Sequence, residues 1–118
     1  MIQKIIFEEK NISLKDIQIT LHVCAVYKGD KVNKSLDSLF DNRVSAAIKV
    51  DSFNGDFGKQ LELYGNSKIG KLSLIGLGNK KNFNSDKLRA ISANIIRSAE
   101  SKKITSISID SKSFKLNL

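Results

Sequence analysis

The stretch from residue 72 to residue 110 constrains the fold more than any other part of the chain. Residues 72–77 are almost entirely apolar, which is typical of a strand buried on both faces of a sheet. Residues 84–101 then repeat apolar side chains at helical spacing, and residues 104–110 alternate isoleucine with polar side chains as a strand does. A strand, a helix and a strand in this order predict parallel strands joined by a right-handed crossover. The prediction is therefore an α/β domain whose helices cover a mixed sheet.

The helix within this unit has the clearest start signal in the sequence. Asn84 suits the N-cap position, and Asp86 places a negative charge in the first turn, where the helix dipole favours it. Phe83 before the cap and Leu88 after it have the spacing of a hydrophobic staple. The predicted apolar face of this helix is formed by Leu88, Ile91, Ile95 and Ala99.

The residues upstream predict further elements of both kinds. Residues 2–7 and 59–64 are expected to be strands, and residues 17–27 form the clearest strand because apolar and polar side chains alternate. Apolar side chains at helical spacing predict one helix over residues 32–40 and a second over residues 44–48. Helices and strands thus alternate along the whole chain.

Size and charge limit the class of protein. A chain of 118 residues fits one domain, so residues 1–118 are expected to form a single domain. No stretch approaches the ~20 apolar residues of a membrane span, and the N-terminus lacks a signal-peptide pattern, so the expected location is the cytoplasm. The net charge of +8 permits contact with nucleic acid, although the lysines are spread along the chain rather than gathered in a run.

Few residues in the sequence could carry chemistry. The single cysteine, Cys24, excludes an internal disulfide and a cysteine-cluster zinc site, and we interpret it as a small buried side chain. The single histidine, His22, shares a strand face with Cys24 but cannot build a metal centre alone. Asp110 ends the last predicted strand, where parallel sheets form crevices, yet one carboxylate does not make a site.

Paired carboxylates could serve acid–base chemistry. Two such pairs occur in turn-like or frayed segments with no histidine nearby, and we interpret both as solvated: Glu8 with Glu9, and Asp51 with Asp56. With no better candidate, the sequence predicts no catalytic, cofactor-binding or metal-binding residue in this chain.

A Gly-Leu-Gly step at residues 76–78 stands where a buried strand exits toward a helix, which is where phosphate-binding turns occur. The dinucleotide pattern needs a third glycine, however, and Lys81 stands in its place. The predicted helix cap also lies too far along the chain to bind a phosphate held by the glycines. We therefore expect Gly76 and Gly78 to allow a tight strand exit.

Four motifs together resemble a known family. An apolar strand at residues 71–78 ends in Gly-Leu-Gly, and residues 84–89 open a helix with a polar cap, an acid, a lysine, a leucine and an arginine. An apolar strand at residues 107–110 follows, and a Tyr-Lys-Gly turn at residues 27–29 ends the early strand. In this order they resemble the N-terminal domain of the leucyl aminopeptidase (cytosol aminopeptidase) family, over roughly residues 17–110.

The resemblance implies a three-layer, macro-like α/β/α sandwich without catalytic residues. Members of the family are two-metal aminopeptidases, usually hexamers, that remove N-terminal residues from peptides. Their metal ligands lie in a separate C-terminal domain, whose Asn-Thr-Asp-Ala-Glu-Gly-Arg-Leu signature has no counterpart here. The implied partners are that catalytic domain, with its two zinc or manganese ions, and sister subunits in a homo-oligomer. The chain is expected to be truncated at its C-terminal end, because it stops at Leu118 before the last elements of such a domain.

Two other functions stay open. A basic nucleic-acid-binding module would bind DNA or RNA with an affinity that falls steeply with salt, and some members of the family bind DNA. A macro-like nucleotide-binding module would hold its ligand at the strand exit at Gly76–Gly78. This second possibility rests on fold analogy.

Overall fold

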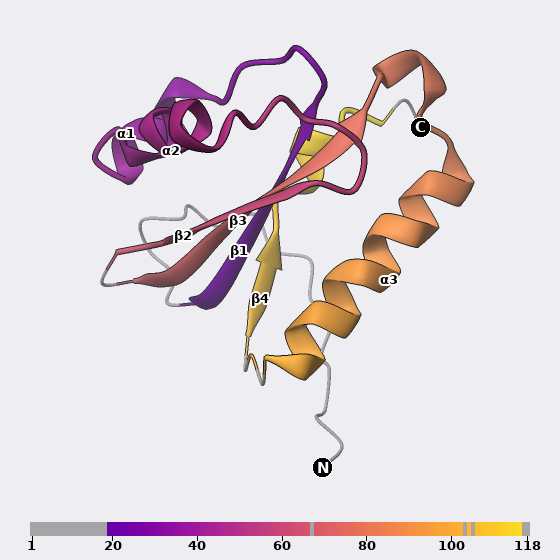
Figure 1. Ribbon diagram of the computed structural model, residues 1–118. Coiled ribbons are helices and arrows are strands. Elements are labelled where there is room, and N and C mark those ends of the chain that lie inside the picture. The colour runs from indigo at the N-terminus through magenta and orange to yellow at the C-terminus, as the bar shows by residue number, and fades with distance from the viewer. Residues whose placement is uncertain (1–18, 67, 103, 105, 117–118) are drawn as a thin grey trace.

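The computed structural model in Figure 1 describes residues 19–66, 68–102, 104 and 106–116. The predicted strand at residues 2–7 and the pair Glu8 and Glu9 lie outside the described residues. No helix within the described ranges is long and apolar enough to cross a membrane. The elements are, in order, β1 (Ile19–Tyr27), α1 (Lys34–Leu39), α2 (Arg43–Asp51), β2 (Gln60–Tyr64), β3 (Ile69–Gly78), the 3-10 turn η1 (Lys80–Asn82), α3 (Ser85–Ser101), β4 (Ile107–Ile109) and the 3-10 turn η2 (Ser111–Phe114).

The four strands form one mixed sheet in the order β2-β3-β1-β4. β1 is parallel to both β3 and β4, and β2 is antiparallel to β3. β3, α3 and β4 therefore form the predicted crossover between parallel strands. β1 lies between the two strands that the crossover joins, so α3 passes over a strand that comes from the start of the described chain.

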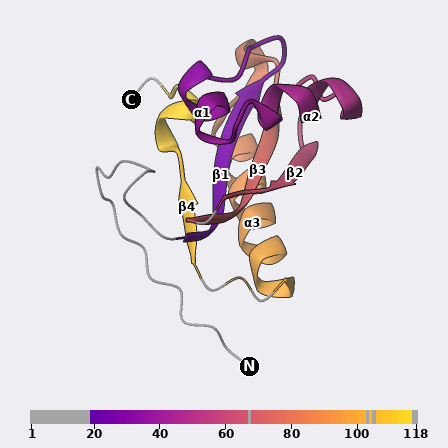
Figure 2. The same cartoon turned by 90° about the vertical axis from the view of Figure 1, so that its left-hand side faces the viewer.

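Helices cover both faces of the sheet. α1 and α2 lie on one face, and α3 lies on the other (Figures 1 and 2). Each face has its own apolar core, and alternate residues of β1 contribute to the two: Val23 and Ala25 to the core under α3, Cys24 and Val26 to the core under α1 and α2. The predicted three-layer α/β/α sandwich is confirmed.

The central position of β1 buries a strand face that carries polar residues. All residues from Leu21 to Tyr27 are buried, so the face that carries His22 is shielded as fully as the apolar face. His22 is only 4% exposed. Alternating polarity usually indicates a strand with one solvated face, and here the second helical layer removes that solvent.

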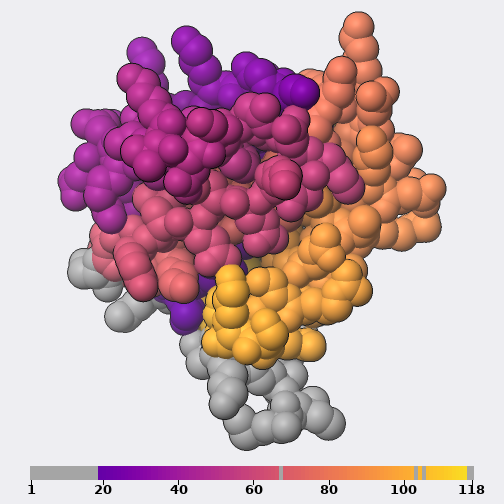
Figure 3. Space-filling view, viewed as in Figure 1, coloured from indigo at the N-terminus to yellow at the C-terminus, as the bar shows by residue number. Residues whose placement is uncertain are grey.

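An ion pair at the surface attaches the end of α3 to β2, on the face of the sheet that α3 covers. Lys102, just after α3, forms an ion pair with Glu62 of β2 at 2.5 Å between Nζ and Oε1. Figure 3 shows the residues at the end of α3 lying next to the β2 region on this side of the molecule. The contact is exposed to solvent, so it contributes little to stability.

α3 begins where the sequence predicts. The Asn84 side chain accepts a hydrogen bond from the Lys87 backbone N–H at 3.0 Å, and Asp86 lies in the first turn. Ile91, Ile95 and Ala99 are buried against the sheet. The predicted cap and apolar face are both confirmed.

Replacing Asn84 with alanine is expected to lower the free energy of unfolding by about 1 kcal/mol, because one N–H of the first turn loses its partner. Urea denaturation measures this change. Asn94→Ala is the matched control, since Asn94 lies exposed in the middle of α3 and alanine is the better helix former there. Equal destabilisation by the two substitutions would contradict the capping role of Asn84.

Candidate functional site

The Gly-Leu-Gly strand exit is packed against the loop that precedes β2. The Gly76 N–H donates to the Lys59 carbonyl oxygen and the Gly78 N–H donates to the Gly55 carbonyl oxygen, both at 2.8 Å. A Cβ atom at Gly76 would lie 2.0 Å from the backbone oxygen of Asp56. The N–H groups that could hold a phosphate are therefore occupied by the protein itself. The glycines serve a tight strand exit, and the N–H groups of Gly76 and Gly78 are not free to bind a phosphate.

A crevice of about 540 Å³ lies instead at the carboxyl end of β1, between α1 and η2. Ligands of open α/β sheets bind outside the carboxyl ends of the strands. The floor includes Cys24 and Val26 of β1, and Leu36 of α1 adds an apolar wall. Asp110 and Lys115 supply charged groups on the opposite side. The crevice thus combines apolar surface with a few polar groups, as ligand sites generally do.

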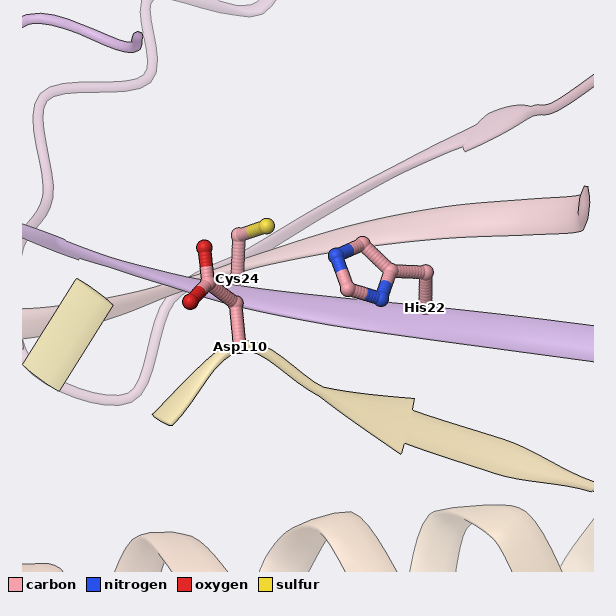
Figure 4. A group of neighbouring side chains, drawn as sticks. All are labelled: His22, Cys24 and Asp110. Atoms are coloured by element: carbon pink, nitrogen blue, oxygen red, sulfur yellow. The ribbon is translucent and has the colours of Figure 1, made fainter. Parts of the chain in front are cut away.

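Three side chains with metal-binding chemistry lie together here: Cys24 and Asp110, which line the crevice, and His22 beside them. Their ligand atoms all lie within 4.8 Å of one another (Figure 4). His22 and Cys24 project from the same face of β1, and Asp110 follows β4 directly. The Asp110 N–H donates to the Val23 carbonyl oxygen at 2.9 Å, which anchors Asp110 beside the two β1 residues.

Burial controls the charge of the first two residues. Burial lowers the pKa of His22 below its usual value, and the nearby Asp110 carboxylate opposes this shift only in part. Burial raises the pKa of the Cys24 thiol to about 12, and Asp110 acts in the same direction. His22 is therefore neutral and Cys24 is a thiol at neutral pH. A catalytic cysteine needs a lowered pKa, so Cys24 is not an activated nucleophile.

The two ring nitrogens of His22 have different surroundings. Nδ1 lies within hydrogen-bonding distance of the Ser108 hydroxyl on β4. Nε2 is buried and has no hydrogen-bond partner in the part of the chain that the structure describes. A buried polar atom without a partner is costly, and such atoms often mark a place where a ligand or ion belongs.

The remaining sequence candidates do not join this cluster. Asp51 is the last residue of α2, and Asp56 forms an exposed ion pair with Lys28 at 3.2 Å. Within the described ranges, His22, Cys24 and Asp110 form the one group of three potential metal ligands, and it includes neither of these aspartates.

The segment η2 also shapes the crevice, and the sequence did not predict it. The Ala25 N–H donates to the Ser113 hydroxyl at 2.9 Å, and the Tyr27 hydroxyl donates to the Phe114 carbonyl oxygen. These bonds attach η2 to β1 beyond the end of β4. Phe114 is buried, and this isolated apolar residue among polar neighbours was the available signal.

Comparison with known proteins points to one family. A family model described as the N-terminal domain of the cytosol aminopeptidase family matches residues 23–117. A probable cytosol aminopeptidase from Alkaliphilus oremlandii is 31% identical over 108 residues, covering 82% of this chain and 22% of that protein. A second, from a Sulfurihydrogenibium species, is 33% identical over 79 residues, covering 65% of this chain and 16% of that protein.

A solved structure supports the fold. A mutant of tomato leucine aminopeptidase superposes with a TM-score of 0.68 at 20% identity, covering 85% of this chain and 21% of that one. The chain thus spans between 16% and 22% of the length of these similar proteins.

Proposed function

Because this chain belongs to the cytosol aminopeptidase family through its N-terminal domain, we propose that it acts as the non-catalytic N-terminal domain of a longer aminopeptidase. One observation carries the proposal: residues 23–117 match the N-terminal domain alone, while the similar proteins are several times longer. The complete protein would remove N-terminal amino acids from peptides. The macro-like character of the fold stays a prediction.

The family resemblance implies two divalent ions, and the described residues do not fit such a pair. Two-metal sites hold two ions about 4 Å apart, each with several protein or water ligands. His22, Cys24 and Asp110 supply only three ligand atoms and are the only such group in the described part of the chain. The catalytic metals would therefore belong to the other domain of the longer protein.

The proposed role of this domain is subunit assembly and control of access to the active site. Its partners would be the catalytic domain and sister subunits in a homo-oligomer, in the cytoplasm. Exposed apolar side chains support such contacts, since Val50 is 82% exposed and Tyr64 is 76% exposed. Contact with DNA through the net charge of +8 stays a prediction, and the comparisons do not favour it.

The chain alone is expected to release no measurable product from a leucine anilide substrate in the presence of Mn²⁺ or Zn²⁺. A full-length relative, assayed in parallel under the same conditions, is the positive control. Turnover by the chain at a rate comparable to the relative would overturn the non-catalytic role.

Assembly has a separate test. We expect that deleting the corresponding N-terminal domain from a full-length relative reduces the number of subunits, as measured by light scattering after size exclusion. An unchanged subunit number would contradict the assembly role while leaving the family membership intact.

A further inference from the structure

The proposed aminopeptidase role gives no function to the cluster of His22, Cys24 and Asp110, which lies on β1 and directly after β4. We propose that His22, Cys24 and Asp110 bind one Zn²⁺ ion, at a site separate from the metal pair of any catalytic domain. The three ligand atoms already lie within 4.8 Å of one another, so small side-chain movements bring them to a common ion.

The donor set selects the metal. A thiolate and an imidazole are ligands that zinc prefers, and a carboxylate completes a common zinc combination. Calcium and magnesium require mainly oxygen ligands, and here only Asp110 supplies oxygen. Zinc is therefore the divalent ion that these three residues suit best among the common ones.

The orientation of His22 is that of a metal ligand. Figure 4 shows one ring nitrogen of His22 directed toward Cys24 and Asp110. This nitrogen is Nε2, since Nδ1 contacts the Ser108 hydroxyl on β4. If Nδ1 carries the proton and donates to Ser108, the lone pair of Nε2 faces the cluster. Such a second hydrogen bond is the usual way in which proteins hold a metal-binding histidine.

The burial of His22 limits which groups can bind its Nε2 atom. His22 is 4% exposed, and the described chain gives Nε2 no hydrogen-bond partner. A solvated histidine would satisfy this atom with bulk water, whereas a buried one needs a protein group, an ordered water or an ion. A bound Zn²⁺ would supply the missing partner.

Binding changes the protonation of one residue only. The Cys24 S–H bond breaks, the sulfur–zinc bond forms, and the proton leaves to solvent, while the neutral His22 ring and the Asp110 side chain bind without losing a proton. Cys24 and Asp110 line the crevice, so the fourth zinc position faces it and is open to water or to another ligand.

The site joins two strands through side chains. β4 has only three residues and lies at the edge of the sheet, and the ion would tie its end to the central strand β1. Saturating Zn²⁺ is therefore expected to raise the Tm of the reduced chain by about 5–10 °C.

Cobalt gives a direct readout, because the whole sequence contains one cysteine and one histidine. Titration of the reduced 118-residue chain with Co²⁺ is expected to produce a thiolate-to-cobalt charge-transfer band and the strong visible absorption of a tetrahedral ion, saturating at one ion per chain. Zn²⁺ should then remove both bands. The charge-transfer band can arise only from Cys24 in a monomeric chain.

The variants identify the ligands. Cys24→Ala should abolish the charge-transfer band, and Asp110→Asn should weaken Co²⁺ binding by at least about tenfold. The Asp110 side chain makes no capping hydrogen bond to η2, so Asp110→Asn should keep the fold. Asp30→Asn is the matched control, because Asp30 is another carboxylate on the same crevice and lies outside the cluster. It should leave Co²⁺ affinity unchanged.

Two results would overturn the proposal. One is the absence of a charge-transfer band at saturating Co²⁺ with the thiol shown to be reduced. The other is binding that Asp110→Asn and Asp30→Asn weaken equally, which would indicate surface charge rather than coordination.

Discussion

Gly76→Ala is expected to lower the free energy of unfolding by about 3–5 kcal/mol, or to prevent folding altogether. The new Cβ atom would lie 2.0 Å from the Asp56 backbone oxygen and 2.7 Å from the Gly55 carbonyl carbon. Both neighbours are backbone atoms, so relief requires moving the loop that bonds to β3. Overpacking a well-formed core already costs about 1–3 kcal/mol, and a clash between main chains lies above that range. Urea denaturation measures the loss.

Gly29→Ala is the control for this substitution. Gly29 has a φ of +86°, which disfavours alanine, but no atom lies within 4 Å of the position of its Cβ. Its expected cost is about 1 kcal/mol, from backbone conformation alone. If the two variants lose the same stability, the close approach of the loop to Gly76 does not determine the folding of this region.

Phe40→Ala is expected to cost about 3–5 kcal/mol, because it opens a large cavity in the core between the sheet and the first two helices. Phe40 is 0% exposed and belongs to the cluster that includes Val44 and Leu72. Phe40 is the C-cap residue that follows α1, and its carbonyl oxygen accepts from the Arg43 backbone N–H and from Arg43 Nε, both at 3.1 Å; alanine keeps this carbonyl oxygen. Chemical denaturation with an unchanged m-value would show that stability alone has changed.

Phe57→Ala removes the same side chain from a more exposed place. Phe57 is 41% exposed, and the Lys87 ammonium lies over its ring at 5.3 Å from the centroid. We expect Phe57→Ala to lower the free energy of unfolding by roughly 1 kcal/mol, which is less than half the loss expected for Phe40→Ala. A comparable loss at both positions would mean that burial of Phe40 contributes less than the structure implies.

Much of the fold could be predicted because local signals agree with it. The Asn84 cap, the apolar face of α3 and the apolar run that becomes β3 each depend on neighbouring residues, and all were read correctly. The short strand β4 is less local. The sequence predicts a strand over residues 104–110, and among the described residues of that range β4 comprises Ile107–Ile109.

The candidate site could not be predicted because it depends on strand order. The alternation in β1 placed His22 and Cys24 on one face, and the strand end placed Asp110 at an edge. The residues near β4 in the sequence do not indicate that β4 pairs with β1 rather than with β3. Alternating polarity is typical of a strand with one solvated face, and the second helical layer is what buries the His22 face. Considered one at a time in the sequence, His22, Cys24 and Asp110 do not indicate a site.

The central place of β1 also has a consequence for the order in which the chain folds. Its neighbours on both sides come from later in the chain, and contacts such as that between His22 and Ser108 span 86 positions. Closing such long loops is entropically unfavourable until the contacts form, so we expect slow folding for a domain of this size. The hairpin of β2 and β3 needs only a short connection and can form early. β1 is the first strand in the described chain, but we expect it to join the sheet after the β2–β3 hairpin has formed.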